Sequence, residues 1–385
     1  MVVGASGQMG AMCVRDLVDF YDAEVIAADL DLGEAKTVLK STKSKKSEAI
    51  RLDANDAQAV RKAAKDADVV ANCAWYELDI KIMTAAIAAG AHYIDLGGFY
   101  DYTLKQLKMD KQAKDAGVTC ILGMGSSPGI TNLCGLAGAK KLDSVHTIDI
   151  HCTWGTRLNL TDAMMPAYSV RTVMDEMTQE PVIVKNGKHI PVPPMSGEVE
   201  VDMPAPAGRV RSGYIKHSET ATMAEYIGKG TKNVSFRIAF PPNDIATFKT
   251  LVQLGFQNTK EIAGVSPKDF LTKMYLDAVA SGREASEMID EYDYFRVDVD
   301  GKKDGMPARA TYFVRTWNDP KRGIPSGRDT ATPPSIASAW LAGGKIKKRG
   351  VLPPEGCIEP EPFFEELGKR EVLVDEELMF SSKFY

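Results

Sequence analysis

MVVGASGQMG, residues 1–10, passes from a short β-rich run into a glycine loop, and the amphipathic segment AMCVRDLVDFY continues it as a helix. The glycines Gly4, Gly7 and Gly10 are three residues apart, and Ser6 stands where the commoner G-x-G-x-x-G spacing has a glycine. A strand, a tight turn and a helix N-terminus in this order let the backbone approach a diphosphate, whose charge meets free N–H groups and the helix dipole. The pattern predicts a dinucleotide site.

An acidic residue follows near the end of the next apolar run, AEVIAADL. Asp29 lies about 20 positions beyond the glycines, where a carboxylate hydrogen-bonds the adenosine ribose. It would repel a 2′-phosphate, and no arginine follows it before Arg51, so the sequence favours NAD over NADP. The alternative is that Asp29 only caps the segment after it.

Composition describes a globular enzyme-sized chain. The 385 residues are 44% apolar and carry a net charge of −5, enough for a large core divided between two domains. The acidic balance offers no basic stripe for nucleic acid, and no apolar stretch reaches the roughly 18 residues that span a membrane. Six cysteines without C-x-x-C pairing argue against zinc and disulfides, so we expect a cytoplasmic protein without metal.

A β-α alternation continues after Asp29. Apolar runs such as DVVANC and AHYIDLGG alternate with helical patterns up to VTCILGMG. Six short strands separated by helices predict an α/β fold with a Rossmann doubly wound parallel sheet over residues 1–125. Ligands of such sheets bind beyond the carboxyl ends of the strands, which directs attention to the residues after each strand.

The pattern changes at Ser126. A helix over SSPGITNLCGLAGAKKLD leads to the alternating strand SVHTIDIHCTW, and further hairpins are expected around Asn186-Gly187 and over residues 291–319. We predict a second α+β domain with a mixed or antiparallel sheet over residues 126–327, which carries substrate groups and the dimer contact.

Several motifs resemble the saccharopine dehydrogenase family, and within it the branch that contains lysine 6-dehydrogenase. They are GASGQMG, DVVANCAWY, AHYIDLGG, GMGSSPGITN, HSETATM and GRDTATPPSIASAWLAGGKIKKRGVLPPE, in this order along nearly the whole chain. The resemblance implies a nicotinamide-dependent oxidoreductase acting on the C–N bond of an amino acid or amine. It also implies a homodimer in which residues 328–385 pack back on the nucleotide domain.

Cofactor contacts are predicted at the glycine loop, at acidic strand ends and at the residues that follow later strands. Asp53 either touches the adenine edge or caps its helix. The predicted cofactor residues are Gly4, Ser6, Gly7, Gln8, Met9, Gly10, Asp29, Asp53, Asn72, Cys73, Ala74, Ser127 and Pro128.

Catalysis at an amine needs a proton acceptor beside a C–H held against the nicotinamide. We predict this role for Tyr76 and Asp95 at strand ends and for His217 and Glu219 in KHSETAT, where a carboxylate beside an imidazole raises its pKa. The alternatives are aromatic packing for Tyr76, a turn cap for Asp95, and a helix cap by Ser218.

Substrate contacts are predicted at Arg157, Asn132 and Gly97. An arginine can hold a substrate carboxylate by a bidentate fork, for which Arg209 and Arg211 are further candidates. Asn132 lies one turn into a helix whose mouth, Ser126–Gly129, presents N–H groups.

The favoured function is oxidative deamination of a lysine-like substrate with NAD. The best alternative is a reductase that forms a saccharopine- or carboxynorspermidine-type secondary amine by reductive condensation. Two further possibilities are a semialdehyde dehydrogenase, whose thiolate nucleophile would be Cys134 or Cys152, and a non-catalytic NAD-binding sensor.

Overall fold

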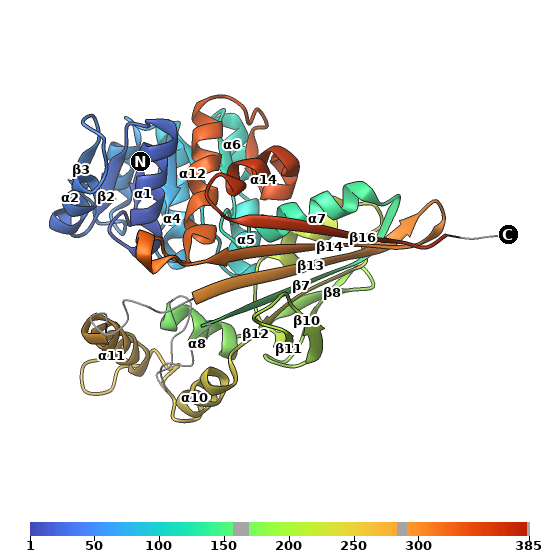
Figure 1. Cartoon of the computed structure of the whole chain (residues 1–385). Helices are drawn as coiled ribbons and strands as arrows, with labels where there is room; N and C mark the ends of the chain where they lie inside the picture. The colour runs from blue at the N-terminus through green and yellow to red at the C-terminus, as the bar shows by residue number, and fades with distance from the viewer. Residues whose placement is uncertain (157–168, 283–290, 383–385) are drawn as a thin grey trace.

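The computed structural model describes residues 1–156, 169–282 and 291–382. Two sheets dominate it: a parallel sheet covered by helices, and a longer sheet that extends away from it towards the C-terminus (Figure 1). Within the described ranges, no helix combines the length and apolar character needed to cross a membrane.

The first sheet has seven parallel strands in the order β15-β6-β5-β4-β1-β2-β3. Strands β1 to β6 have the order of a dinucleotide-binding doubly wound fold, as predicted. A seventh strand, β15, comes from near the end of the chain and pairs with β6. The strands are β1 Val2–Val3, β2 Ile26–Asp29, β3 Glu48–Arg51, β4 Val69–Asn72, β5 His92–Asp95, β6 Thr119–Ile121 and β15 Gly350–Leu352.

Helices cover both faces of this sheet (Figure 1). Residues 100–115 form two helices rather than one, because the chain turns at Lys108–Met109 and buries Met109 in the core. The helices of this part are α1 Gln8–Tyr21, α2 Leu32–Lys40, α3 Ala57–Ala64, α4 Asp79–Ala89, α5 Tyr100–Leu107, α6 Asp110–Asp115 and α12 Arg328–Ala342.

The second sheet has nine strands and is mixed, as predicted. Its main path is β10-β11-β12-β7-β13-β14-β16, in which β12 runs parallel to β7 and the other neighbours are antiparallel, while β8 pairs with β12 and β9. The hairpin at Asn186-Gly187 is present between β8 and β9. The strands are β7 Ser144–Thr156, β8 Val182–Lys185, β9 Lys188–Pro191, β10 Val199–Asp202, β11 Arg209–Tyr214, β12 Asn233–Ala239, β13 Glu291–Lys303, β14 Met306–Trp317 and β16 Leu373–Phe380.

Helix α7 packs against β13 and β14 and so connects the two sheets. Its residues are buried almost throughout, and they join the main core with the inner face of the second sheet. The remaining helices are α7 Ile130–Lys141, α8 Val170–Thr178, α9 Glu219–Ile227, α10 Pro242–Gln253, α11 Pro267–Gly282, α13 Pro354–Cys357 and α14 Pro360–Gly368.

The C-terminal segment is shared between the two sheets. Helix α12 packs on α1, and the buried pair Arg370–Asp16 (2.7 Å), with Ser335 also donating to Asp16, ties this return to the first domain. Strand β16, however, pairs along eight residues of β14 in the second sheet. Of the residues 328–385 that are expected to pack on the nucleotide domain, α12 and β15 lie against the first sheet and its helices, whereas β16 pairs with β14. The division into domains at residues 125 and 328 stays a prediction.

Candidate active site

The glycine loop forms a cradle of bare backbone at the start of α1. Gly4 has φ +75°, and a Cβ on Gly10 would lie 2.0 Å from the Gly4 carbonyl oxygen, so both positions require glycine. Gly7 is the N-cap of α1, and the first turn holds no acidic residue. The first-turn N–H groups have no intrahelical partner, so this loop fits the diphosphate of a dinucleotide.

Asp29 lies at the carboxyl end of β2, beside the cradle. Its carboxylate accepts hydrogen bonds from the N–H groups of Ser6 (2.8 Å) and Asp31 (3.1 Å), while the cap of α2 is Asp31 itself. Arg51 is paired with Asp29 across the parallel strands, and its Nε donates to the Leu30 carbonyl at 3.4 Å. The Arg51 guanidinium, 22 positions away in sequence, thus lies beside the strand end that carries Asp29, which weakens the argument for NAD over NADP.

Asn72 organises the loop after β4. Its Oδ1 accepts from the Ala74 N–H at 3.0 Å, and its Nδ2 donates to Asp79 at 2.8 Å. Ala74 thereby lies against Gly4, with its nitrogen 2.9 Å from where a Gly4 Cβ would be. The intervening Cys73 donates its N–H to Val3. These residues hold the edge of the cradle through backbone groups.

Asp53 follows β3, but it does not cap α3. Its carboxylate accepts from the Asn55 N–H at 2.8 Å, whereas Asp56 occupies the cap position and accepts from two N–H groups of the helix. The capping alternative is therefore wrong, and contact with adenine stays a prediction.

Asp95 is buried and surrounded by donors. It accepts from the N–H groups of Gly97 (3.0 Å) and Gly123 (2.6 Å) and from Gln106 Nε2 (2.6 Å). Burial raises its pKa, against the lowering effect of these hydrogen bonds. Its carboxylate joins the ends of β5 and β6.

Gly97 leaves room for Pro128. A Cβ on Gly97, whose φ is +94°, would lie 2.4 Å from the Pro128 ring. Because Gly97 has no side chain, the Ser127–Pro128 loop can pack on the end of β5. This packing accounts for Gly97 without a substrate contact.

Glu219, the first residue of α9, gathers three polar side chains between the two sheets. It accepts from Ser127 Oγ at 2.5 Å and from Thr131 Oγ1 at 3.0 Å, and its other oxygen pairs with His217 Nδ1. Its side chain is completely buried. The structure therefore brings together two of the predicted catalytic residues and Ser127, and Ser218, although at the cap position, makes no side-chain cap.

His217 and Glu219 form a buried ion pair. Burial alone lowers the pKa of His217. The carboxylates of Glu219 and Glu176 both raise it, so the pKa of His217 lies above its usual value. Burial likewise disfavours the charged form of Glu219, but its contact with His217 holds its pKa below the usual value. The ring stacks on Phe236 at 3.9 Å, which fixes its plane. The pair can hold and release a proton.

Asn132 connects the loop before α7 to a residue that the sequence analysis missed. Its Oδ1 accepts from the Gly129 N–H and its Nδ2 donates to Glu355 Oε2, both at 2.9 Å. Burial raises the pKa of Glu355 to about 7. The only signal for Glu355 was its place in the GVLPPE motif.

Tyr76 reaches from the first sheet to the helices of the second. Its hydroxyl donates to Asp175 on α8 at 2.9 Å, and Lys268 of α11 pairs with the same carboxylate. Burial, and then Asp175, raise the pKa of Tyr76. Its ring also packs on Phe99 and Tyr102. These are the contacts of the packing alternative, and the catalytic role of Tyr76 stays a prediction.

The arginine candidates are not at this site. Arg209 and Arg211 are exposed on β11, where they pair with acidic residues of β10 and the preceding residue Glu198. Arg157 lies outside the described residues.

Cys134 and Cys152 are poor nucleophiles. Burial raises the pKa of both thiols, and around Cys152 the carboxylates of Glu219, Glu176 and Asp329 raise it further. Cys152 lies beside Ser127, with the sulfur 3.8 Å from its hydroxyl oxygen. Thiolate chemistry of the semialdehyde dehydrogenase type is therefore disfavoured.

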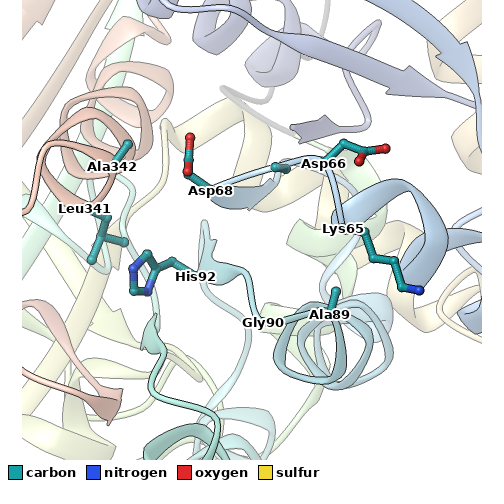
Figure 2. Close-up of a pocket in the computed structure, with 9 residues that line it drawn as sticks. Lys65, Asp66, Asp68, Ala89, Gly90, His92, Leu341 and Ala342 are labelled. Atoms are coloured by element: carbon teal, nitrogen blue, oxygen red, sulfur yellow. The ribbon is translucent and has the colours of Figure 1, made fainter.

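A separate cavity of about 440 Å³ lies at the opposite edge of the first sheet (Figure 2). Asp68 and His92 border it just before β4 and at the start of β5, with Leu341 of α12 on the other side. His92 Nδ1 accepts the Thr119 N–H at 2.9 Å. Since ligands bind at the carboxyl ends of parallel strands, this cavity is not the dinucleotide site.

Comparison with known families agrees with this architecture. Residues 1–121 match the saccharopine dehydrogenase NADP binding domain, and residues 125–373 match the saccharopine dehydrogenase C-terminal domain. The chain belongs to the saccharopine dehydrogenase family. A solved structure of saccharopine dehydrogenase (L-Glu forming) from Saccharomyces cerevisiae superposes with a TM-score of 0.73 at 16% identity, covering 98% of this chain and 99% of that one, which confirms the fold.

Two curated relatives of similar length have names that refer to amines. Carboxyaminopropylagmatine dehydrogenase of Synechocystis sp. is 24% identical and covers 96% of this chain and 95% of its own length. Carboxynorspermidine synthase of Vibrio cholerae is 23% identical, over 89% and 87% respectively. This member of the family is an NAD(P)-dependent oxidoreductase that acts on CH–NH or CH–NH2 groups.

Proposed function

We propose that the protein forms a secondary amine by reducing the imine between an aldehyde that bears a carboxyl group and a di- or polyamine. The observation that carries this is the buried His217–Glu219 pair, whose carboxylate also accepts from Ser127 and Thr131. Glu219 favours the protonated imidazole, and reduction of an imine needs a positioned acid of this kind. The names of the two curated relatives support the same substrate class.

The reaction balances as a condensation followed by a reduction. The aldehyde and the primary amine lose water, and the imine then takes up one hydride and one proton. The bound nicotinamide supplies the hydride, and the cradle at Gly4–Gly10 would hold its diphosphate. His217, held protonated by Glu219, donates a proton to the leaving hydroxyl or to nitrogen, and Ser127 and Thr131 keep Glu219 in place.

The other predicted residues support this pair in our proposal. Asp95 positions the glycine loops after β5 and β6, because its carboxylate is already engaged by three donors. Asn132 orients the Ser127–Gly129 loop through the Gly129 N–H. Tyr76 aligns α8 through Asp175, beside Glu176.

The second candidate is oxidative deamination of a lysine-like substrate by the same residues acting in the opposite direction. The low exposure of the His217–Glu219 pair favours it as well, since a base of this kind can take a proton from an ammonium group. The homodimer and the cytoplasmic location stay predictions.

The test is a panel of primary amines, each offered with an amino-acid semialdehyde and NADH or NADPH, followed by cofactor absorbance and by mass spectrometry of the product. The proposal requires cofactor oxidation with a product mass equal to that of the imine plus two hydrogens. Turnover of lysine with the oxidised cofactor, and none with any aldehyde–amine pair, would establish the second candidate instead. Cofactor binding with no turnover in either direction would identify a sensor.

A further inference from the structure

The start of α12 is fixed against the ends of β13 and β14. Arg328 donates to the carbonyl of Trp317, the last residue of β14, and at 3.0 Å to that of Pro325. Ser326 donates to Glu291, the first residue of β13, at 2.8 Å. These bonds bring Asp329, which follows Arg328, to the end of the second sheet.

Asp293 lies on β13 at this same end. It is paired directly with Trp154 of β7 and with Thr316 of β14. Residues directly opposite in a sheet share a face, and Cys152 lies two residues from Trp154 and therefore on that face too. Asp293 and Thr316 thus continue the face that carries Cys152, about 7 Å further along the strand.

Acceptors at this end lack donors. Asp329 and Thr316 are 2% and 0% exposed, and Asp329 Oδ2 and Thr316 Oγ1 have no hydrogen-bond partner among the residues described. Within the same ranges, no donor reaches the carboxylate of Asp293, and the charge that acts on it most strongly is that of Asp329. The guanidinium of Arg328 is engaged with backbone carbonyls.

Two neighbouring carboxylates and a hydroxyl, with buried oxygen atoms on Asp329 and Thr316 that lack donors, match an alkylammonium group, which has three donors and one positive charge. We propose that Asp293, Asp329 and Thr316 form an ammonium subsite that takes the distal nitrogen of a di- or polyamine, while its other nitrogen reacts beside His217 and Glu219. This assignment rests on the proposed function and names what selects its amine.

Calorimetric binding to the full chain tests the subsite without requiring turnover. The probes are propane-1,3-diamine and butylamine, in which a methyl group replaces the second ammonium group. We expect the protein to bind the diamine at least tenfold more tightly, and Asp293→Asn and Asp329→Asn each to remove this preference while leaving butylamine affinity within twofold. Asp300→Asn is the matched control, because Asp300 lies on the same strand but pairs with Arg309.

Equal diamine affinity in the parent protein and both variants would overturn the proposal. The Asp329→Asn variant is tested alongside Asp293→Asn, because Asp329 is buried whereas Asp293 is only half-buried. Circular dichroism verifies that both variants are folded. If Asp329→Asn does not fold, an unchanged preference in folded Asp293→Asn still overturns the subsite. Diamine preference at these residues without any imine reduction would contradict the proposed function alone.

Discussion

The cradle at Gly4–Gly10 and the side chains around Cys152 differ in charge. The cradle has no charged side chain and presents backbone N–H groups at the start of a helix. The region around Cys152 buries the carboxylates of Glu219, Glu176 and Asp329, of which Glu219 is paired with His217. The first region is therefore suited to an anion and the second to a cation, and a reaction between a dinucleotide and an amine needs both. Each prediction below changes one side of this contrast.

Gly10→Ala should have the largest effect on cofactor binding. Its Cβ would lie 2.0 Å from the Gly4 carbonyl oxygen, so the backbone of the cradle must move. We expect the Kd of the reduced cofactor, measured by fluorescence, to rise about 100-fold or more. Gly368→Ala, where a Cβ meets open space, is the control. Unchanged affinity in Gly10→Ala would remove the diphosphate from this loop.

Glu219→Gln should lower kcat by roughly 10² to 10³ while leaving cofactor affinity intact. Without the Glu219 carboxylate, only Glu176 still opposes the effect of burial on His217, so the pKa of His217 falls. In the reducing direction, where His217 must be protonated, the loss of kcat with rising pH should then begin at lower pH. Glu225→Gln, an exposed neighbour on α9, should match the parent. An unshifted pH profile would show that this pair does not carry the proton.

Arg51→Ala separates the two cofactors. If the guanidinium beside Asp29 holds a 2′-phosphate, kcat/KM with NADPH should fall about tenfold and that with NADH should stay within twofold. The control is Arg61→Ala, exposed on α3. Equal losses with both cofactors, or none, would restore the argument for NAD from Asp29.

Glu355→Gln should change the pH dependence of stability. Burial raises the pKa of Glu355 in the folded protein to about 7. The free energy of unfolding is therefore highest at low pH, and it falls by up to about 3 kcal/mol as pH rises from roughly 4.5 to 7. The variant should therefore show a smaller drop in Tm between pH 5 and pH 8. Exposed Glu361→Gln should keep the full drop, and an equal drop in Glu355→Gln would contradict the assignment.

The first sheet was predictable because its information is local. Each strand, turn and helix of residues 1–125 is written contiguously, and the glycine loop carries its own geometry. The hairpins of the second sheet were predictable for the same reason. Strands β15 and β16 were not assigned to their sheets, because pairing with β6 and β14 depends on contacts between residues at least 58 positions apart in sequence.

The site was only partly predictable. His217 and Glu219 are two residues apart, and their contact follows from the sequence, whereas Arg51 becomes a neighbour of Asp29 only through parallel pairing. Asp95 looked like a base because it ends a strand, but a strand end also gathers free N–H groups, and these occupy it. Glu355, Asp293 and Asp329 come from three distant segments, and no local spacing marks them.

The late strands set the order in which this molecule can be made. Both sheets receive an outermost strand only after residue 349, β15 on one and β16 on the other. A nascent polypeptide on the ribosome thus leaves the backbone edges of β6 and β14 open, and open edges invite pairing with other chains. Completion of both sheets consequently waits for the same late segment, residues 350–380, and deletion of that segment would damage both together.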